Sequence, residues 1–423
     1  EYCNYLTPAF IGVHYDNVQR GIYAGSDRMN EVNALLFSAL SMISSSAYSS
    51  EIQIDRADEI WKNCFEEKEF IYLRYQTDTL LQVIRFFSDI DCLVKPESVY
   101  SGDTVFVREM FIIPQKENDG VYAVVRSSDG VIALLSPTVP QNETNLFSTL
   151  FSQLADSSFV DFTFSAQNKQ SYHNLHLDDS SVIYNGEVPL RPLRFSISAN
   201  AYFKNQRVAD SILQLFSFNP EKLNSYTELD GTITYVESFG TFRVSPDGKM
   251  ELLISDENRG IPITEYLDYA NTEENYSFYE LLSVSCNIAN QLMNISHELF
   301  GQNADICIGE MKYQAGKLEI SYNYTYDNLP IMQENLTPLR AFHFSFYKGK
   351  LIAFSANCAF FAGYGTKSEI DSQSWVCNQY AQTLTSPVNM QIIPAYTLLY
   401  DSSDTLSPDW LFCVQYTEQK TGK

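Results

Sequence analysis

ELDGTITYVESFGTFRVSPDGKMEL, residues 228–252, alternates apolar and polar side chains in three short runs that are separated by two turns. Such alternation is the spacing of strands with one buried face, and the apolar positions are Ile233, Tyr235, Phe242, Val244, Met250 and Leu252. The turns hold Gly240 and a Pro-Asp-Gly run at 246–248, which favour tight reversals. The segment therefore predicts an antiparallel β-meander, and nothing in it would transfer a proton or hold a ligand.

The composition indicates a large globular protein with an acidic surface. The chain has 423 residues, of which 45% are hydrophobic and 19% are charged, enough for two or three domains with their own cores. Its formal net charge of -24 repels phosphate backbones and anionic lipid surfaces, so we expect no nucleic-acid partner. The 28 tyrosines and 28 phenylalanines favour strands over helices.

The start of the chain favours export. The first residue is Glu1, without an initiator methionine, and no stretch reaches about 18 consecutive apolar residues. A removed signal peptide or a missing N-terminal membrane anchor is the expected explanation, although a trimmed cytosolic chain would begin in the same way. We expect an extracytoplasmic protein, either anchored in the cell membrane or secreted, that meets the membrane only through the missing anchor.

The second half of the chain repeats a plan of one helix followed by strands. Residues 205–216 have helical spacing ahead of the meander. Residues 277–301 predict a longer helix, which begins with a capping box formed by Ser277 and Glu280 and stops at Gly301. Strands are expected after it at 305–313, 317–326, 341–347 and 351–359. A helix laid on an antiparallel sheet predicts the α+β class.

We therefore expect a multidomain α+β protein whose helices pack on antiparallel β-meanders. An N-terminal α+β domain is expected over residues 1–189, with helical spacing at 77–88 and a polar stretch at 165–185 near its end. A central helix-plus-meander domain is expected over 190–270, and a C-terminal helix-plus-antiparallel-sheet domain over 271–423.

The sequence contains no motif that predicts catalysis. The eight cysteines form no C-x-x-C pair, G-x-S-x-G is absent, and His297-Glu298 lacks the second histidine of a metalloprotease motif. In the polar stretch, His173, His176 and Asp178 are candidate ligands for zinc. A solvated loop explains the same residues, so we expect no metal site, no cofactor, no catalytic residue and no enzymatic activity.

Two segments carry a family resemblance. The run FSFNPEKLNSYTELDGTITYVESFGTFRVSPDGKMEL, residues 216–252, has an acidic residue, Asp-Gly-Thr and Tyr-Val ahead of a strand, and then a Ser-Pro-Asp-Gly turn. The run IIPAYTLLYDSSDTLSPDWLFCVQY, residues 392–416, reads as a closing pair of strands. Both resemble the YycH/YycI family of bacterial envelope regulators and the related PepSY-like modules. The resemblance covers about the second half of the chain, and its motifs are structural.

The resemblance implies a membrane-tethered extracytoplasmic protein that modulates a two-component sensor histidine kinase by contact. The expected partner is such a kinase, or a sister regulator in the same membrane. An alternative is a secreted peptide-binding or glycan-binding protein, or a hydrolase, with its site in a cleft between domains. A pocket of convergent titratable groups would favour the alternative, whereas flat surfaces and an exposed strand edge would favour the regulator.

Overall fold

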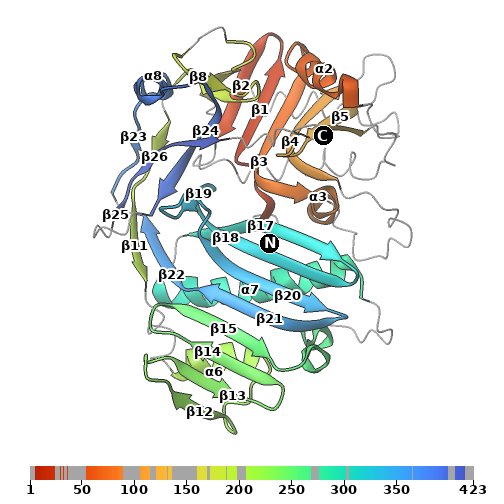
Figure 1. The fold of residues 1–423 in the computed structure, drawn as a ribbon, viewed down its shortest axis with the longest axis vertical. Coiled ribbons are helices and arrows are strands. Elements are labelled where there is room, and N and C mark those ends of the chain that lie inside the picture. The colour runs from red at the N-terminus through yellow and green to blue at the C-terminus, as the bar shows by residue number, and fades with distance from the viewer. Residues whose placement is uncertain are drawn as a thin grey trace.

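The molecule is elongated, and two large sheets make up most of its length (Figure 1). The N-terminal sheet lies at one end, a long helix crosses the middle, and the meander forms the other end. Within the described residues, strands account for 49% and helices for 22%. This computed structural model describes residues 5–23, 29, 32, 36, 54–88, 105–114, 121–130, 132–135, 160–168, 172–186, 188–197, 206–267, 276–301, 304–363, 365–398 and 405–414.

The N-terminal sheet has eight strands in the order β6-β5-β4-β3-β1-β2-β7-β9, and every neighbouring pair is antiparallel. The strands are β1 (Phe10–Tyr15), β2 (Val18–Tyr23), β3 (Phe70–Leu80), β4 (Phe106–Pro114), β5 (Val121–Arg126), β6 (Ile132–Leu135), β7 (Val160–Phe164) and β9 (Val182–Tyr184).

Aromatic rings fill one face of the N-terminal sheet. The ring of Phe164 lies 4.9 Å from that of Tyr72, and Phe111 packs 5.0 Å from Trp61 of helix α2 (Ile54–Cys64). Glycine leaves the room for this packing, because a Cβ added at Gly21 would lie 2.3 Å from the Phe10 ring. Edge-to-face contacts of this kind add to the burial of large apolar surfaces, so this face forms a continuous core.

The second large sheet has thirteen strands and runs from the meander to the end of the chain. Its main path is β12-β13-β14-β15-β21-β20-β18-β19-β24-β26, with β16 beside β21, β17 beside β18 and β8 beside β24. The strands are β8 (Leu175–Leu177), β12 (Asn224–Thr227), β13 (Ile233–Val236), β14 (Gly240–Val244), β15 (Lys249–Ile254), β16 (Ile261–Pro262), β17 (Asp305–Gln314), β18 (Lys317–Tyr326), β19 (Leu329–Met332), β20 (Arg340–Tyr347), β21 (Lys350–Asn357), β24 (Val388–Thr397) and β26 (Pro408–Val414).

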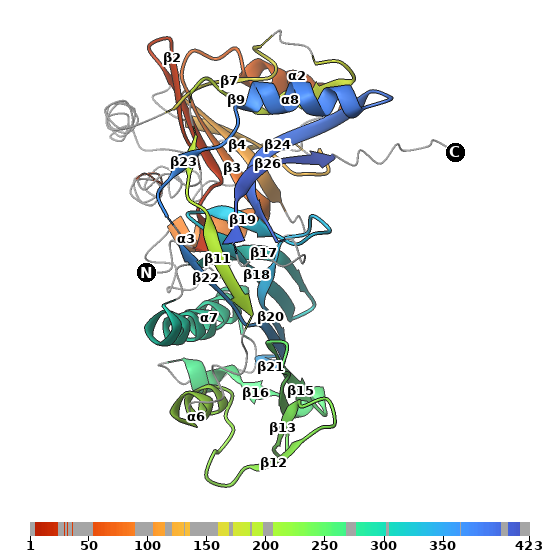
Figure 2. The ribbon, with the colours of Figure 1, turned by 90° about the vertical axis from the view of Figure 1, so that its left-hand side faces the viewer.

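Helices α6 (Gln206–Leu215) and α7 (Phe278–Phe300) lie on the same side of this sheet (Figure 2). After α6, the ring of Phe216 packs 4.5 Å from that of Phe354, while α7 places Ser285 Oγ 2.8 Å from Tyr322 Oη. The capping box at the start of α7 and the left-handed Gly301 at its end, φ 62°, confirm the predicted helix. None of the helices in the described part of the chain combines the length and apolar character that a bilayer crossing requires.

Two small sheets connect the middle of the chain to its end. In one, β11 (Leu193–Ile197) lies between β22 (Ala359–Gly363) and β25 (Thr405–Leu406). In the other, β10 (Pro189–Leu190) pairs with β23 (Ser368–Glu369). Helix α8 (Gln373–Thr383) follows and packs on β26, with the rings of Tyr380 and Phe412 stacked 4.1 Å apart.

The predicted α+β class is wrong, because the described chain is mostly β-sheet, built as large antiparallel and mixed sheets. Several strands were not expected, since β8, β9 and β12 are short, polar or both and carry little period-two signal. The helix expected at 77–88 is shorter than predicted: β3 continues to Leu80, and α3 spans Leu81–Ser88. Thr79 pairs with Val107 of β4, so sheet pairing extends β3 into the predicted helix.

The predicted meander and the four later strands are confirmed. β13 pairs with β14 and β14 with β15, in antiparallel register, and β17, β18, β20 and β21 form the expected antiparallel set. β15 also pairs with β21, so one sheet continues across the boundary predicted at residue 270. The division of the chain at residues 189 and 270 stays a prediction.

Candidate functional site

The candidate zinc ligands lie in and around β8, and the structure gives them separate surroundings. His173 and His176 are exposed, and His173 Nε2 lies 3.2 Å from the side-chain amide of Asn174. Asp178 is partly buried and directed at Arg126. Across the residues that the structure describes, no three His, Cys, Asp or Glu side chains are grouped so that they could hold a metal ion.

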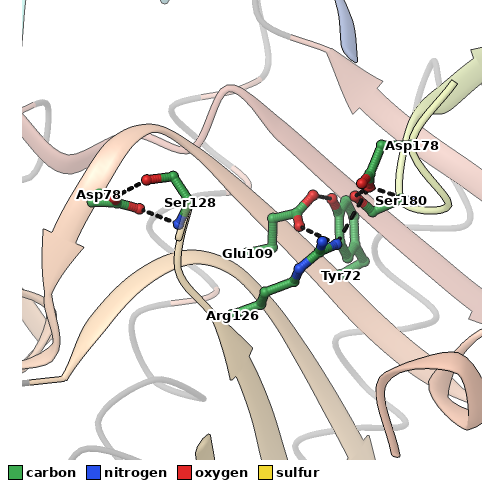
Figure 3. A network of polar contacts seen from close by, with 7 residues as sticks. All are labelled: Tyr72, Asp78, Glu109, Arg126, Ser128, Asp178 and Ser180. Carbon is green, nitrogen blue, oxygen red and sulfur yellow. Dashed lines mark hydrogen bonds and ion pairs between the residues drawn. The ribbon is translucent and has the colours of Figure 1, made fainter. Parts of the chain in front are cut away.

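Asp178 belongs instead to a polar network between the N-terminal sheet and β8 (Figure 3). Arg126 Nη1 lies 3.3 Å from Asp178 Oδ1 and 3.7 Å from Glu109 Oε2. Tyr72 donates its hydroxyl hydrogen to Glu109 Oε1 over 2.6 Å. The backbone N–H and the hydroxyl of Ser180 both donate to Asp178 Oδ1, over 3.0 and 2.6 Å. Each charged group of the network therefore has an opposite charge and a hydrogen bond.

The network is closed to solvent. Only 3% of the Glu109 side chain and 11% of the Asp178 side chain are exposed. Burial raises the pKa of Tyr72 well above its ordinary value, and the charge of Glu109 raises it further. Burial lowers the pKa of Arg126, but Asp178 and Glu109 outweigh this and the net shift is upward. Tyr72 thus stays protonated and Arg126 stays charged near neutral pH, so neither is poised for acid or base chemistry.

The network connects the N-terminal sheet to helix α2 and to β24 of the large sheet. Arg126 and Glu109 come from the paired strands β5 and β4, and the Arg126 guanidinium lies 5.5 Å from the centre of the Trp61 ring. The backbone N–H of Asp178 donates to the carbonyl of Met390 in β24 over 3.0 Å. A buried ion pair with these partners holds the N-terminal sheet against the C-terminal strands.

The described cysteines are free thiols, and most are buried in the core. Burial raises the pKa of Cys286 to about 12, and it raises those of Cys64, Cys307 and Cys377 to the same level. A thiol with such a pKa holds almost no thiolate at neutral pH, so these cysteines are poor nucleophiles.

The meander end of the large sheet presents a different chemistry. Three large hydrophobic residues are solvent-exposed there: Tyr226 at 57%, Leu253 at 48% and Leu229 completely. Between them Arg243 lies on the open face of the sheet, with Nη2 3.0 Å from Glu228 Oε2 and Nη1 3.9 Å from Glu251 Oε2. Exposed aromatic and aliphatic side chains beside ordered charges are suited to recognition of another protein.

A row of polar side chains extends from this end along the open face. Register places Glu251 beside Ser355, and Ser355 beside His343. The His343 ring is half-buried, and its Nδ1 atom has no hydrogen-bond partner. Burial lowers the pKa of His343, and the nearby Arg340 lowers it further, so the ring is neutral at neutral pH. The open face can therefore form hydrogen bonds through these side chains.

Sequence reasoning missed Glu109, Arg126 and Tyr72, although a signal was available. Glu109 and Phe111 share one face of β4, and Phe111 is fully buried. A charged residue at a core-facing position needs a partner of opposite charge, and Arg126 stands directly opposite Glu109 in β5. What the sequence lacked was the register that makes these two residues neighbours.

Comparisons with known proteins identify a related fold. The chain is similar to the crystal structure of YycH from Bacillus subtilis, with a TM-score of 0.54 and 11% sequence identity, over 98% of this chain and 95% of that one. No family model and no curated protein matches the sequence. At this identity the likeness concerns the fold, and the chain therefore has a YycH-like fold.

Proposed function

We propose that this protein is a non-catalytic regulator on the outer side of a bacterial cell membrane. In full length it is tethered by an N-terminal transmembrane helix, belongs to the YycH/YycI family and carries PepSY-like modules in its second half. It modulates a two-component sensor histidine kinase by direct contact, alone or together with a sister regulator. The observation that carries the proposal is the likeness to YycH, which extends over 98% of the chain.

Two features of the site support this reading. The charged groups of the buried network are paired with one another, so they strengthen the architecture and leave no charge free for substrate. Three exposed apolar residues, Tyr226, Leu229 and Leu253, lie instead at the meander end, where they reach solvent. A regulator that acts by contact needs a rigid body and an accessible surface, and it has no need of an acid and base pair.

The test starts from the full-length gene in its native host. Chemical crosslinking of intact cells, followed by purification of the tagged protein and mass spectrometry, is expected to recover a sensor histidine kinase. Deletion of the gene is expected to change the phosphorylated fraction of the cognate response regulator, measured on phosphate-affinity gels, and a plasmid copy is expected to restore it. A crosslinked sample without any kinase, with unchanged phosphorylation and turnover of a peptide or glycan by the purified protein, would contradict the proposal.

A further inference from the structure

Three described sheet edges in this protein are protected by other parts of the chain or by their own sequence. At the β9 edge of the N-terminal sheet, the side-chain amide of Gln373 accepts from the Tyr184 N–H and donates to the Val182 carbonyl, both over 2.9 Å. Gln373 is only 4% exposed and takes the place of a neighbouring strand. A capped edge cannot pair with another chain.

The large sheet closes two of its edges in a similar way. Beside β17, the hydroxyl of Thr77 donates to the carbonyl of Ile308 over 3.1 Å, which joins the end of β3 to this strand. At the far end of the sheet, β26 begins with a proline, and its residues Trp410 and Leu411 are buried. Proline and burial are both recognised protections for an edge strand.

The edge formed by β12 has none of these protections. β12 is the first strand in the order of the large sheet, and among the described strands it pairs only with β13. All four residues of β12 are exposed, so neither face of the strand is covered. Its sequence, Asn-Ser-Tyr-Thr, contains no proline and no charged residue. An edge left open, in contrast to the protected edges at β9, β17 and β26, is available for strand addition.

The open edge is also held in a fixed shape. The turn after β12 is closed by the Glu228 N–H, which donates to the carbonyl of Thr232 over 2.8 Å. The Glu228 carboxylate accepts from the Thr234 hydroxyl over 2.6 Å and from two nitrogen atoms of Arg243 over 3.2 and 3.0 Å. These bonds tie the edge to β13 and β14, so a binding partner would meet an ordered strand and lose less entropy on binding.

The charges around β12 decide which kind of partner fits. Residues 219–254 contain six acidic and three basic side chains. Two of the basic ones, Arg243 and Lys249, are occupied by ion pairs within the meander. The exposed acidic residues Glu221 and Asp230 precede and follow the strand in the sequence. A partner segment with lysine or arginine beside the edge would be attracted, while a second copy of this chain, of net charge -24, would be repelled.

We propose that β12 is a docking edge, to which a basic, extended segment of a partner protein adds as a further strand. Main-chain hydrogen bonds to residues 224–227 supply the pairing, and Tyr226 and Leu229 supply apolar contact beside it. The inference goes beyond the proposed function, because it specifies the surface and the chemistry of the bound segment whichever protein supplies it.

The test uses the full chain and an array of fluorescent decapeptides with lysine at alternate positions and varied residues between them. Members of the array are expected to bind. The same peptides N-methylated at alternate amides keep the charge and lose the strand hydrogen bonds, so their affinity is expected to be lower by about tenfold or more. Thr227→Pro, which removes a backbone N–H that points away from β13, is expected to reduce binding to a similar extent, and Tyr226→Ser, which removes the apolar contact, is expected to weaken it. Hydrogen exchange at residues 224–227 is expected to slow when peptide is bound.

Trp375→Ser is the matched control, since Trp375 is a comparably exposed aromatic residue on α8, at the other end of the molecule. It is expected to leave binding unchanged. If Thr227→Pro unfolds the protein, Leu229→Lys tests the same edge by charge repulsion. Equal binding of glutamate-substituted peptides, equal binding of N-methylated peptides, or no binding at all would overturn the inference. So would a wild-type dimer that Thr227→Pro abolishes, because it would make a second copy the occupant. None of these results would contradict the recovery of a kinase by crosslinking, because that experiment tests the proposed function separately.

Discussion

Two arginines of this chain each lie between two carboxylates, but in opposite environments. Arg126 lies 3.3 and 3.7 Å from Asp178 and Glu109 in the interior, and its own side chain is 20% exposed. Arg243 lies 3.0 and 3.9 Å from Glu228 and Glu251 on the open face of the meander, where its side chain is 34% exposed. The chemical groups and distances are similar, and the main difference is access to water.

This difference in access to water decides whether the charged groups stabilise the fold or shape a binding surface. Away from water, an arginine and two carboxylates depend on one another, because removing one leaves the others charged and unsolvated. At the surface, water replaces a lost partner at little cost, so the arrangement contributes little to stability and can be used to shape a binding surface. Four predictions test the comparison, and each uses the full chain.

The largest effect is expected from Arg126→Met. The substitution removes the ion-pair partner of the nearly buried Glu109, and breaking a buried pair in this way costs about 3–5 kcal/mol of unfolding free energy. Urea denaturation followed by tryptophan fluorescence measures the loss, since Trp61 lies beneath Arg126. Adding Glu109→Gln to the same chain should recover part of the stability. A midpoint unchanged by Arg126→Met would show that the interior triad has no structural role.

A smaller loss is expected from Gln373→Leu, which removes the cap from β9. The Tyr184 N–H and the Val182 carbonyl then lie buried without partners, and a lost partner of this kind costs about 1–3 kcal/mol. The same denaturation experiment measures it, with Gln373→Glu as a variant that keeps the acceptor and loses the donor. If Gln373→Leu is as stable as wild type, side-chain capping does not explain the closed edge.

His343 is half-buried on the open face, and its effect is expected in the pH dependence of stability. Its pKa is lowered in the folded protein, chiefly by burial, so the unfolded chain binds a proton more readily. The free energy of unfolding should therefore fall as pH drops below about 6.5 towards the folded pKa, and His343→Gln should lose this part of the slope. Identical slopes for the two proteins between pH 7 and pH 5 would contradict the assignment.

The smallest effect is expected from Arg243→Met. Its partners are solvated, so the melting temperature should change by no more than about 2 °C, and the difference should shrink as salt is added. Differential scanning fluorimetry at low and high salt measures both. Peptide binding at β12 is expected to weaken, because Glu228 loses a contact that orders the turn. A large loss of stability here would remove the contrast with Arg126.

The elements that sequence analysis predicted well are those whose signal lies within one segment. Helix α7 combines a capping box, a long apolar face and a terminal glycine, and β14 shows clean alternation. The strands that were missed depend on distant partners. β8 is short and partly exposed, and it is a strand because it pairs in parallel with β24, more than 200 residues later in the chain. Local periodicity cannot predict such pairing.

The same limit applied to the candidate site. The polar stretch that holds Asp178 stood out in the sequence, but the sequence offered only a solvated loop or a candidate zinc ligand there, whereas the structure gives Asp178 Arg126 as its partner. Gln373 carried no signal at all, because its role depends on the position of β9 beside α8. Positions within a strand can be read from alternation, while the contacts between strands require the register.

The strands at the end of the chain pair with strands from much earlier in the sequence. β24 pairs with β8, and β25 pairs with β11. The ring of Trp410 also packs 5.6 Å from that of Tyr184 in the N-terminal sheet. Contacts over such sequence separations form slowly and late. A chain that is still being synthesised therefore lacks these contacts until its C-terminal strands have been made. Folding of this protein is therefore completed by its C-terminal strands, and a product truncated before them would lack the contacts that hold the N-terminal sheet to the rest of the molecule.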